Sequence, residues 1–261
     1  GGSTPGVEYQ LMNGTTPVGF PMLGTGSNID FAPVTTAGSY MVVANDPSTT
    51  CSKNMTGSAT VVVNALPAAQ TVTGGGSYCN GAAGVAVGLA SSATGISYQL
   101  MNGATAVGSP VAGTGSAITF GAQAAGTYSV LATNNTTGCT NGMTGSATVV
   151  MNTTPSSYAV VTTTSSYCAG GEGVNVMLSG STSGVNYQLY RVGTIAVGAP
   201  VAGTGGMINF GPQTVAGNYT VMAADATSSC SAMMSGGASI VINPLPTAYT
   251  VTGGGGYCNG S

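Results

Sequence analysis

Charge is the scarcest property of this sequence. Of 261 residues only seven are charged, two basic and five acidic, and the formal net charge at pH 7 is −3. Histidine and tryptophan are absent, which excludes imidazole general bases and histidine-ligated metals. The two basic residues, Lys53 and Arg191, are too few to form a phosphate-binding face. We therefore expect no nucleic-acid partner.

Long apolar segments are missing as well. No run approaches the roughly 20 apolar residues of a membrane-spanning helix, so we expect no membrane insertion. Hydrophobic residues nevertheless make up 43% of the chain, and the mean hydropathy is +0.33. Disordered chains combine low hydrophobicity with high net charge, which is the opposite profile. The composition therefore predicts folded domains with apolar cores.

A threefold internal repeat organises the chain, with a period of about 89 residues. Three motifs recur in the same order: a Tyr-Gln-Leu triplet, a Gly-Thr-Gly triplet and an Ala-Gly-x-Tyr tetrad. The triplets begin at Tyr9, Tyr98 and Tyr187 and at Gly24, Gly113 and Gly203, and the tetrads end at Tyr40, Tyr128 and Tyr219. Such self-similarity indicates an array of equivalent modules, and about 90 residues is the size of one small β-sandwich.

A prolyl joint follows each unit, at Pro67, Pro155 and Pro246. These joints divide the chain into modules at residues 1–66, 67–155 and 156–246, followed by a short segment at residues 247–261. The first module starts after the position of its first strands, and the last segment supplies a first strand and a Tyr-Cys pair.

Two explanations of these ends stay open. In one, the segment completes the first module of another copy by β-strand addition, with Cys258 bridging Cys51 of the neighbour. Repeated head to tail, this contact would build an open filament. In the other, the chain is a window of a much longer array.

Apolar and polar residues alternate in short segments of the middle module. The alternating apolar residues are Val85, Val87 and Leu89; Ile96, Tyr98 and Leu100; Ile118 and Phe120; Tyr128 and Val130; and Ala147, Val149 and Met151. Each group predicts a strand with one buried face. The 44 glycines disfavour helix, since Gly costs about 1 kcal/mol in a helix interior. The predicted fold class is all-β.

The glycine runs at residues 74–76 and 253–256 and the Gly-Thr-Gly triplets could be mistaken for phosphate-binding loops. No Lys-Ser/Thr follows them, and no helix is predicted behind them. We interpret these glycines as hairpin turns between strands. No cofactor is expected.

The tetrads ending at Tyr40, Tyr128 and Tyr219 resemble the tyrosine corner that opens strand F of immunoglobulin-like (Ig-like) sandwiches. Together with the Tyr-Cys-x-Gly opening, the Tyr-Gln-Leu strand, the Cys after the tetrad and the Val-x-Asn-x-x-Pro ending, they resemble the tandem Ig-like repeats of large secreted surface and adhesin-type proteins of Bacteroidota. The resemblance covers essentially the whole chain. It implies tandem Ig-like β-sandwich modules in a bacterial cell-surface protein. Unlike antibody domains, the middle module has Tyr98 in place of a Trp and Val130 in place of a Cys, so a central disulfide is not expected.

Six cysteines fall into two periodic sets. One set follows a tyrosine, at Cys79, Cys168 and Cys258; the other lies eleven residues after each tetrad tyrosine, at Cys51, Cys139 and Cys230. No C-x-x-C spacing occurs, so disulfides are predicted rather than a metal site. Cysteine usage and low charge together indicate an oxidising, extracellular setting.

The pairing of the cysteines stays open in the sequence. Pairs within a module, Cys79–Cys139 and Cys168–Cys230, close loops of about 60 residues and gain up to roughly 4 kcal/mol in the chain-entropy model. A rival set joins successive modules: Cys51–Cys79, Cys139–Cys168 and Cys230–Cys258. A third arrangement links the facing poles of stacked neighbours. We lean to the pairs within a module, although their cysteines lie at opposite poles of an ordinary sandwich.

No carboxylate holds its place in all three modules. The five are Glu8, Asp30, Asp46, Glu172 and Asp225. A glycosidase-type pair would need two of them within roughly 10 Å in a cleft, and their spacing does not indicate one. We predict no enzyme activity and no metal site. Asp46, Asn134 and Asp225 align just after the tetrad strand, where an Asx side chain is expected to cap a turn.

The sequence thus predicts a non-enzymatic extracellular structural protein, a fibre subunit or the stalk of a surface adhesin, built from disulfide-stabilised repeats. A nearly uncharged surface offers little repulsion against association. The expected partner is another copy, joined head to tail, or further modules of a longer array. Two other functions fit: an array of glycan- or cell-binding modules, and spacer modules of a secreted enzyme.

Overall fold

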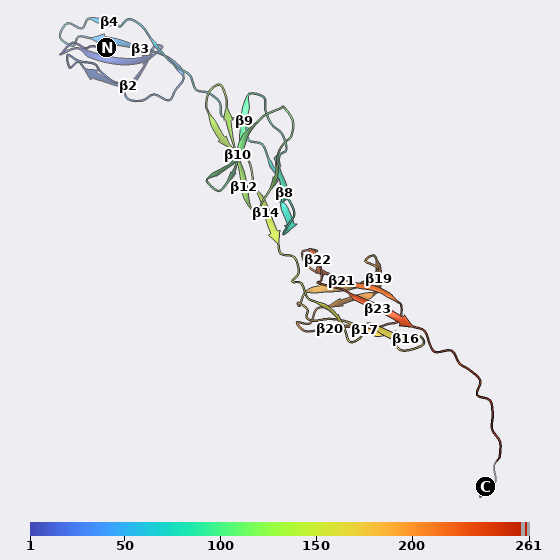
Figure 1. The fold of residues 1–261 in the computed structure, drawn as a ribbon. Helices are drawn as coiled ribbons and strands as arrows, with labels where there is room; N and C mark the ends of the chain where they lie inside the picture. Colours follow the sequence, from blue (N-terminus) through green and yellow to red (C-terminus); the bar gives the residue numbers. More distant parts are fainter. Residues whose placement is uncertain (257–258, 260–261) are drawn as a thin grey trace.

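The computed structural model describes residues 1–256 and residue 259. Every regular element in that part of the chain is a β-strand, which confirms the all-β fold class. The strands gather into three bodies that follow one another along the chain, and residues 244–256 continue as an extended segment without strands (Figure 1). No helix in this part is long and apolar enough to cross a membrane.

The first module has one antiparallel sheet, with β2, β1, β3 and β4 in that order and β5 beside β3. Its strands are β1 (Glu8–Asn13), β2 (Thr16–Leu23), β3 (Gly38–Asn45), β4 (Ser52–Asn54) and β5 (Ala59–Val61). Among the described residues no second sheet lies against it.

The second module is a sandwich of two sheets. A six-stranded sheet has the order β10, β9, β12, β14, β7, with β13 beside β12, and a three-stranded sheet has the order β11, β8, β6. The strands are β6 (Val72–Gly74), β7 (Gly76–Cys79), β8 (Val85–Leu89), β9 (Ile96–Asn102), β10 (Thr105–Ala112), β11 (Ile118–Gln123), β12 (Gly126–Asn134), β13 (Thr140–Gly142) and β14 (Ala147–Asn152). All pairs are antiparallel except β7 with β14.

The third module repeats this sandwich. Its sheets have the orders β16, β23, β21, β18, β19, with β22 beside β21, and β15, β17, β20. The strands are β15 (Val160–Thr162), β16 (Ser166–Cys168), β17 (Val174–Leu178), β18 (Val185–Arg191), β19 (Ile195–Ala202), β20 (Ile208–Gln213), β21 (Gly217–Asp225), β22 (Ser231–Met233) and β23 (Ala238–Asn243). Here β16 runs parallel to β23.

The period-two alternation places the predicted core residues inside. Val87 of β8 and Tyr98 of β9 are each 1% exposed, and they come from opposite sheets of one core. Residues on the same face of a strand recur at every second position, so the alternating apolar residues meet between the sheets. The prediction is less accurate at the strand end, where Met151 is 45% exposed.

The tetrad tyrosines form tyrosine corners in all three modules. Each hydroxyl donates a hydrogen bond to the carbonyl oxygen four residues upstream: Tyr40 to Thr36 at 2.7 Å, Tyr128 to Ala124 at 2.9 Å and Tyr219 to Val215 at 2.7 Å. The bond ties the start of β3, β12 or β21 to the segment that precedes it. The second and third modules are therefore Ig-like sandwiches with this feature.

The glycine runs correct one sequence prediction, because they are not hairpin turns. Residues 74–76 carry the chain from β6 in one sheet to β7 in the other, with φ between 84° and 129°. Gly113 lies between β10 and β11, again in different sheets, and an added Cβ would overlap the carbonyl of Ala93. A chain that crosses between packed sheets must turn sharply and pass close to other backbone, which only glycine allows.

Candidate functional site

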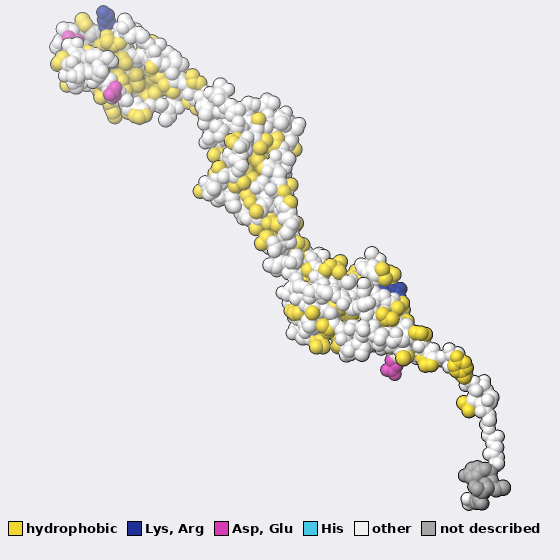
Figure 2. All heavy atoms as spheres, viewed as in Figure 1, with side chains coloured by type: hydrophobic (Ala, Val, Ile, Leu, Met, Phe, Trp, Pro, Cys, Tyr) yellow, Lys and Arg dark blue, Asp and Glu magenta, His cyan; other side chains and the backbone are white. Residues whose placement is uncertain are grey.

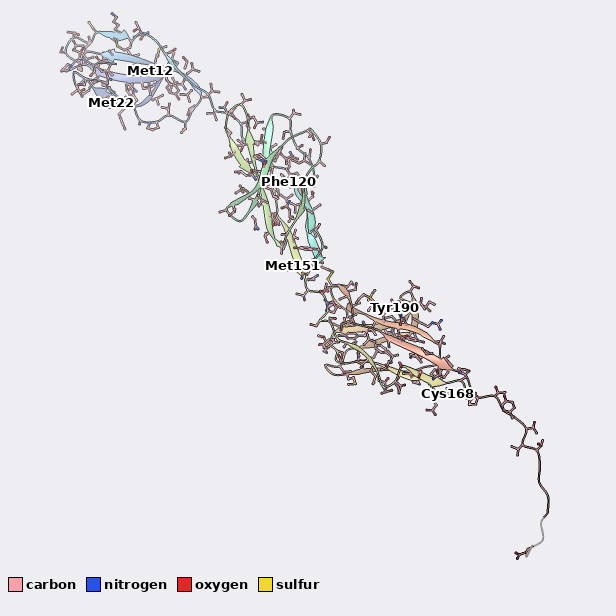
Figure 3. All side chains as sticks on the ribbon, in the orientation of Figure 1. Met12, Met22, Phe120, Met151, Cys168 and Tyr190 are labelled. Atoms are coloured by element: carbon pink, nitrogen blue, oxygen red, sulfur yellow. A yellow bond between two sulfur atoms is a disulfide. The ribbon has the colours of Figure 1, made fainter. Side chains whose placement is uncertain are left out.

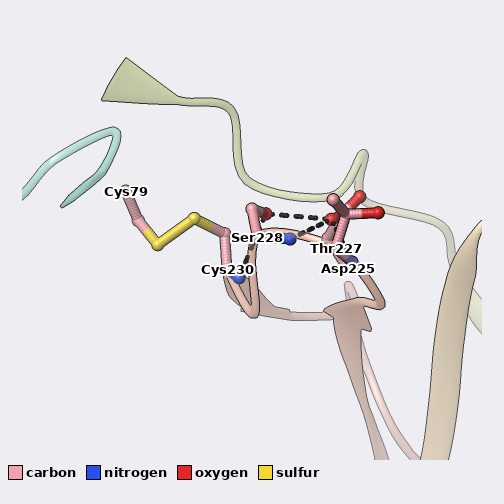
Figure 4. Close-up of a disulfide and its surroundings, with 5 residues drawn as sticks. All are labelled: Cys79, Asp225, Thr227, Ser228 and Cys230. Atoms are coloured by element: carbon pink, nitrogen blue, oxygen red, sulfur yellow. Dashed lines mark hydrogen bonds between the residues drawn. A yellow bond between two sulfur atoms is a disulfide. The ribbon is translucent and has the colours of Figure 1, made fainter. Parts of the chain in front are cut away.

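The joint between the second and third modules carries a disulfide between Cys79 and Cys230, whose Cα atoms are 5.5 Å apart (Figure 4). Cys79 is the last residue of β7 and lies opposite Asn152, the last residue of β14. It therefore stands where the chain leaves the second module. Cys230 is fully buried in the loop between β21 and β22 of the third module. The bridge ties the end of one module to the near pole of the next.

This pairing differs from the pairs within a module that the sequence favours. Cys79 is not bound to Cys139, nor Cys168 to Cys230. The thiols of Cys51, Cys139 and Cys168 are free, so the rival pairs Cys51–Cys79 and Cys139–Cys168 do not form either. A disulfide needs Cα atoms within about 7 Å. The end of β7 and the loop after β12 lie at opposite poles of their sandwich, so the arrangement between facing poles is the one that forms. The predicted pairs with Cys258 lie outside the described residues.

Asp225 closes the loop that holds Cys230. Its Oδ1 accepts hydrogen bonds from the Ser228 backbone N–H at 2.7 Å, the Ser228 hydroxyl at 2.9 Å and the Thr227 N–H at 3.0 Å. These bonds favour the ionised carboxylate and hold the pKa of Asp225 below its ordinary value. Asp46 and Asn134 cap the equivalent turns, which confirms the predicted Asx role.

Removing the Asp225 carboxylate will loosen the loop before Cys230. Asp225→Ala loses the acceptor of three hydrogen bonds, and we expect the Ser228 amide to exchange roughly tenfold faster at pH 7. Asp225→Asn is the matched control, because Asn134 keeps the same turn in the second module. Exchange is measured by NMR.

The sign of the pH dependence follows from the lowered pKa. The carboxylate stabilises the loop fully above the ordinary Asp pKa of about 3.9, and this stabilisation is lost as the pH falls through the lower folded value. An NMR titration of Asp225 with a midpoint at or above the ordinary value would contradict the hydrogen-bonded turn.

The joint between the first and second modules repeats the same geometry. Cys139 lies in the loop after β12, and its Sγ is 4.0 Å from the carbonyl oxygen of Asn64. In sequence Asn64 aligns with Asn152, which lies opposite Cys79 in the bridged joint. Cys139 therefore points to the position that a Tyr-Cys strand beside β5 would reach.

The first module exposes a sheet face that is covered in the other two. Leu11 and Val42 are only half-buried, whereas the aligned Leu100 and Val130 are 1% and 2% exposed. In the second module the sheet of β6, β8 and β11 shares the core with these residues. A hollow of about 340 Å³ opens on this face, with apolar lining from Tyr9, Ile29, Phe31, Val42 and Met55.

The C-terminal segment has the sequence of a covering strand. Residues 250–255 read TVTGGG, as do residues 71–76 of the second module. There Val72 is in β6 and 8% exposed, whereas Val251 is 95% exposed and residues 244–256 form no strand. The segment thus carries the sequence of β6, one of the three strands that cover the corresponding face in the second module.

Gln99 has a role that the sequence analysis missed. The register of β9 and β10 is irregular between Val107 and Val111. At this irregularity the Gln99 side chain donates to the carbonyl oxygens of Leu100, Val107 and Gly108 at 2.9 to 3.3 Å. Gln10 and Gln188 make the same contacts. The recurrence of Gln in the Tyr-Gln-Leu triplet is the signal that could have revealed it.

The five carboxylates come from different elements. Glu8 is in β1, Asp30 lines a second hollow of the first module, and Glu172 lies between β16 and β17 of the third. In the part of the chain that the structure describes, no three Cys, Asp or Glu side chains gather as a metal site would require.

No protein-family model matches the chain, and a comparison with curated proteins found no match. Several solved structures are similar at low identity. Fibronectin(III)-like modules of Clostridium thermocellum CbhA have 14% identity and a TM-score of 0.37, covering 70% of this chain and 100% of theirs. Chicken CNTN1 FN1-FN3 domains have 9% identity and a TM-score of 0.31, covering 90% of this chain and 88% of theirs.

Immunoglobulin domains 1-4 of Sidekick-1 have 12% identity and a TM-score of 0.22, covering 91% of this chain and 66% of theirs. Scores this low carry no argument about function. The Ig-like architecture rests on the chain's own sheets and tyrosine corners.

Proposed function

We propose that this protein is an extracellular structural protein, a fibre subunit or the stalk of a surface adhesin of the kind that Bacteroidota secrete. It acts without catalysis. Its modules form a line that bears tension and presents a surface of low charge. The observation that carries this proposal is the Cys79–Cys230 bridge between successive modules.

The bridge supports a mechanical role because it joins residues 151 positions apart in two modules. A bridge inside one module would stabilise that module without joining it to the next. Here tension on the joint passes through the two sulfur atoms as well as through the linker. Lasting disulfides belong to oxidising compartments, which supports the extracellular setting.

The scarcity of charge supports association between copies. Figure 2 shows basic and acidic side chains only as isolated spots on a face that is otherwise polar or apolar. Lysine on an exposed strand commonly blocks edge-to-edge pairing, and Lys53 in β4 is the only lysine of the chain. The partner is a second copy joined head to tail, or further modules of a longer array; nucleic acid and the membrane interior are not partners.

The open face and the C-terminal segment support a head-to-tail contact. In the described residues the face on β1 and β3 lacks the three-stranded sheet that covers it in the second module, and residues 250–255 carry the sequence of one of those strands, β6. Because the two surfaces differ, the contact is heterologous and repeats without closing. It builds a filament in which the modules lie in series.

Electron microscopy of the purified chain under oxidising conditions tests this function. Uniform filaments with an axial repeat of three modules are expected. A matched variant that lacks residues 247–261 should remain dispersed, because the open face then has no strand to accept. Dispersed particles of the unmodified chain over a wide concentration range would contradict the fibre function.

A further inference from the structure

The bridged joint defines a rule for the whole repeat. It joins the cysteine of a Tyr-Cys pair, Cys79, to the loop cysteine of the module that follows, Cys230. The three modules repeat the same sequence motifs, and the second and third modules have the same strand order. Applied to the described free cysteines, the same rule assigns partners to Cys168 and Cys51.

We infer that a further bridge forms at every head-to-tail junction, between Cys168 of one copy and Cys51 of the next. This assignment rests on the proposed self-association and identifies the partner as a second copy of this chain. It gives Cys51 a partner other than the Cys258 expected from the sequence.

Cys168 occupies the position in the third module that Cys79 occupies in the second. It is the last residue of β16 and lies opposite Asn243, the last residue of β23. Its side chain is exposed. Figure 3 shows it at the end of the third module from which the C-terminal segment departs. The loop cysteine of a following module would therefore lie beside Cys168, as Cys230 of the third module lies beside Cys79.

Cys51 lies in a loop with the same shape as the loop of Cys230. The N–H of Asp46 donates to the Cys51 carbonyl at 2.9 Å, and Asp225 makes the same bond to Cys230 at 2.9 Å. The residues before the two cysteines, Thr50 and Ser229, both have φ 59°. This left-handed conformation is uncommon outside glycine, so its recurrence indicates one specific loop shape. The loop therefore holds the exposed Cys51 thiol in the position that Cys230 has in the third module.

The open face of the first module also accepts Val251, the apolar residue of the C-terminal segment. In the second module the N–H of Val72 donates to the carbonyl of Thr144 at 2.9 Å, and Val72 belongs to the core. Thr56, which lines the hollow of the first module, aligns with Thr144, and Val251 aligns with Val72. Seating Val251 in this hollow removes from water a side chain that is 95% exposed.

Each bridge forms by two thiol–disulfide exchanges with a small disulfide such as oxidised glutathione. The thiolate of one copy attacks the oxidant, forms a mixed disulfide and releases one glutathione thiolate. The thiolate of the second copy then displaces the other glutathione. The two protein thiols are oxidised to one disulfide, the oxidant is reduced to two thiols, and the two protons pass to them.

Complementary variants test the Cys168–Cys51 pair. In a Cys139→Ser, Cys258→Ser background, one chain carries Cys168→Ser and the other Cys51→Ser. With oxidised glutathione, each chain alone should stay monomeric on a non-reducing denaturing gel, and their mixture should give a covalent dimer and nothing larger. The background chain should give a ladder in steps of 25.1 kDa that reduction abolishes.

Tryptic mapping of the unmodified oligomer identifies the bridges. Lys53 and Arg191 are the only Lys and Arg residues, so trypsin yields fragments 1–53, 54–191 and 192–261. Fragment 1–53 should be linked to fragment 54–191, and this link should disappear with Cys168→Ser. Retention of fragment 1–53 in a disulfide-linked product after Cys168→Ser, or a background ladder that survives Cys168→Ser, would overturn the assignment.

The outcomes separate the two proposals. Filaments without a Cys168–Cys51 bridge overturn the bridge assignment and leave the structural function standing. An oxidised chain that stays monomeric, with the Cys168 and Cys51 thiols free and no filaments, overturns both. A dimer in the mixture together with filaments of the unmodified chain supports both.

Discussion

Stretching a single molecule from its two ends will release about 500 Å more chain after reduction than before it. The bridge joins residues 151 positions apart, and each residue adds about 3.4 Å of extended chain. While the bridge is intact, tension passes from Cys79 to Cys230 through sulfur. The chain between them cannot lengthen even when both modules unfold. Atomic force microscopy measures this difference directly as contour length.

The control for this experiment isolates the bridge from contacts between copies. The other four cysteines are replaced by serine, so that copies cannot become covalently linked. When Cys79→Ser and Cys230→Ser are added, the chain should extend to its full contour length both with and without reductant. If the chain that keeps Cys79 and Cys230 extended fully before reduction, the bridge between modules would be refuted.

Truncating one equivalent leucine in each module will have unequal effects. Leu189→Ala and Leu100→Ala should each destabilise their modules by about 2 to 5 kcal/mol, because both side chains are 1% exposed and leave cavities. Leu11→Ala should cost clearly less in the dispersed chain, since Leu11 is only half-buried on the open face. Hydrogen exchange of peptic peptides from β1, β9 and β18 reports the opening free energy of each module separately.

Assembly will change the destabilisation caused by Leu11→Ala, and only that one of the three. When the C-terminal segment of another copy covers the open face, Leu11 becomes part of a core, and the cost of Leu11→Ala should rise toward that of Leu100→Ala. The effect of Leu189→Ala should not depend on assembly, because its module is already complete. Equal costs for all three variants in the dispersed chain would mean that the first module has no open face.

The strands and the tyrosine corners can be predicted from the sequence because both depend on local spacing. Side chains alternate between the two faces of a strand, so Tyr98 and Leu100 identify a buried face without knowledge of the partner strand. The tyrosine corner likewise joins Tyr128 to a carbonyl only four residues away. The role of the glycines at residues 74–76, by contrast, cannot be predicted from local spacing. A hairpin turn and a crossing between sheets both need positive φ, and local sequence does not tell which strands the turn connects.

By itself, the sequence determines that the chain is an all-β array of equivalent modules with two periodic cysteine sets and almost no charge. Only the tertiary structure decides the partner of Cys79. A disulfide requires two Cα atoms within about 7 Å, and which cysteines come that close depends on how the poles of successive modules meet. The same holds for Leu11 and Leu100, which share one place in the repeat. Burial depends on the opposing strands, and these cover Leu100 and leave the face of Leu11 open.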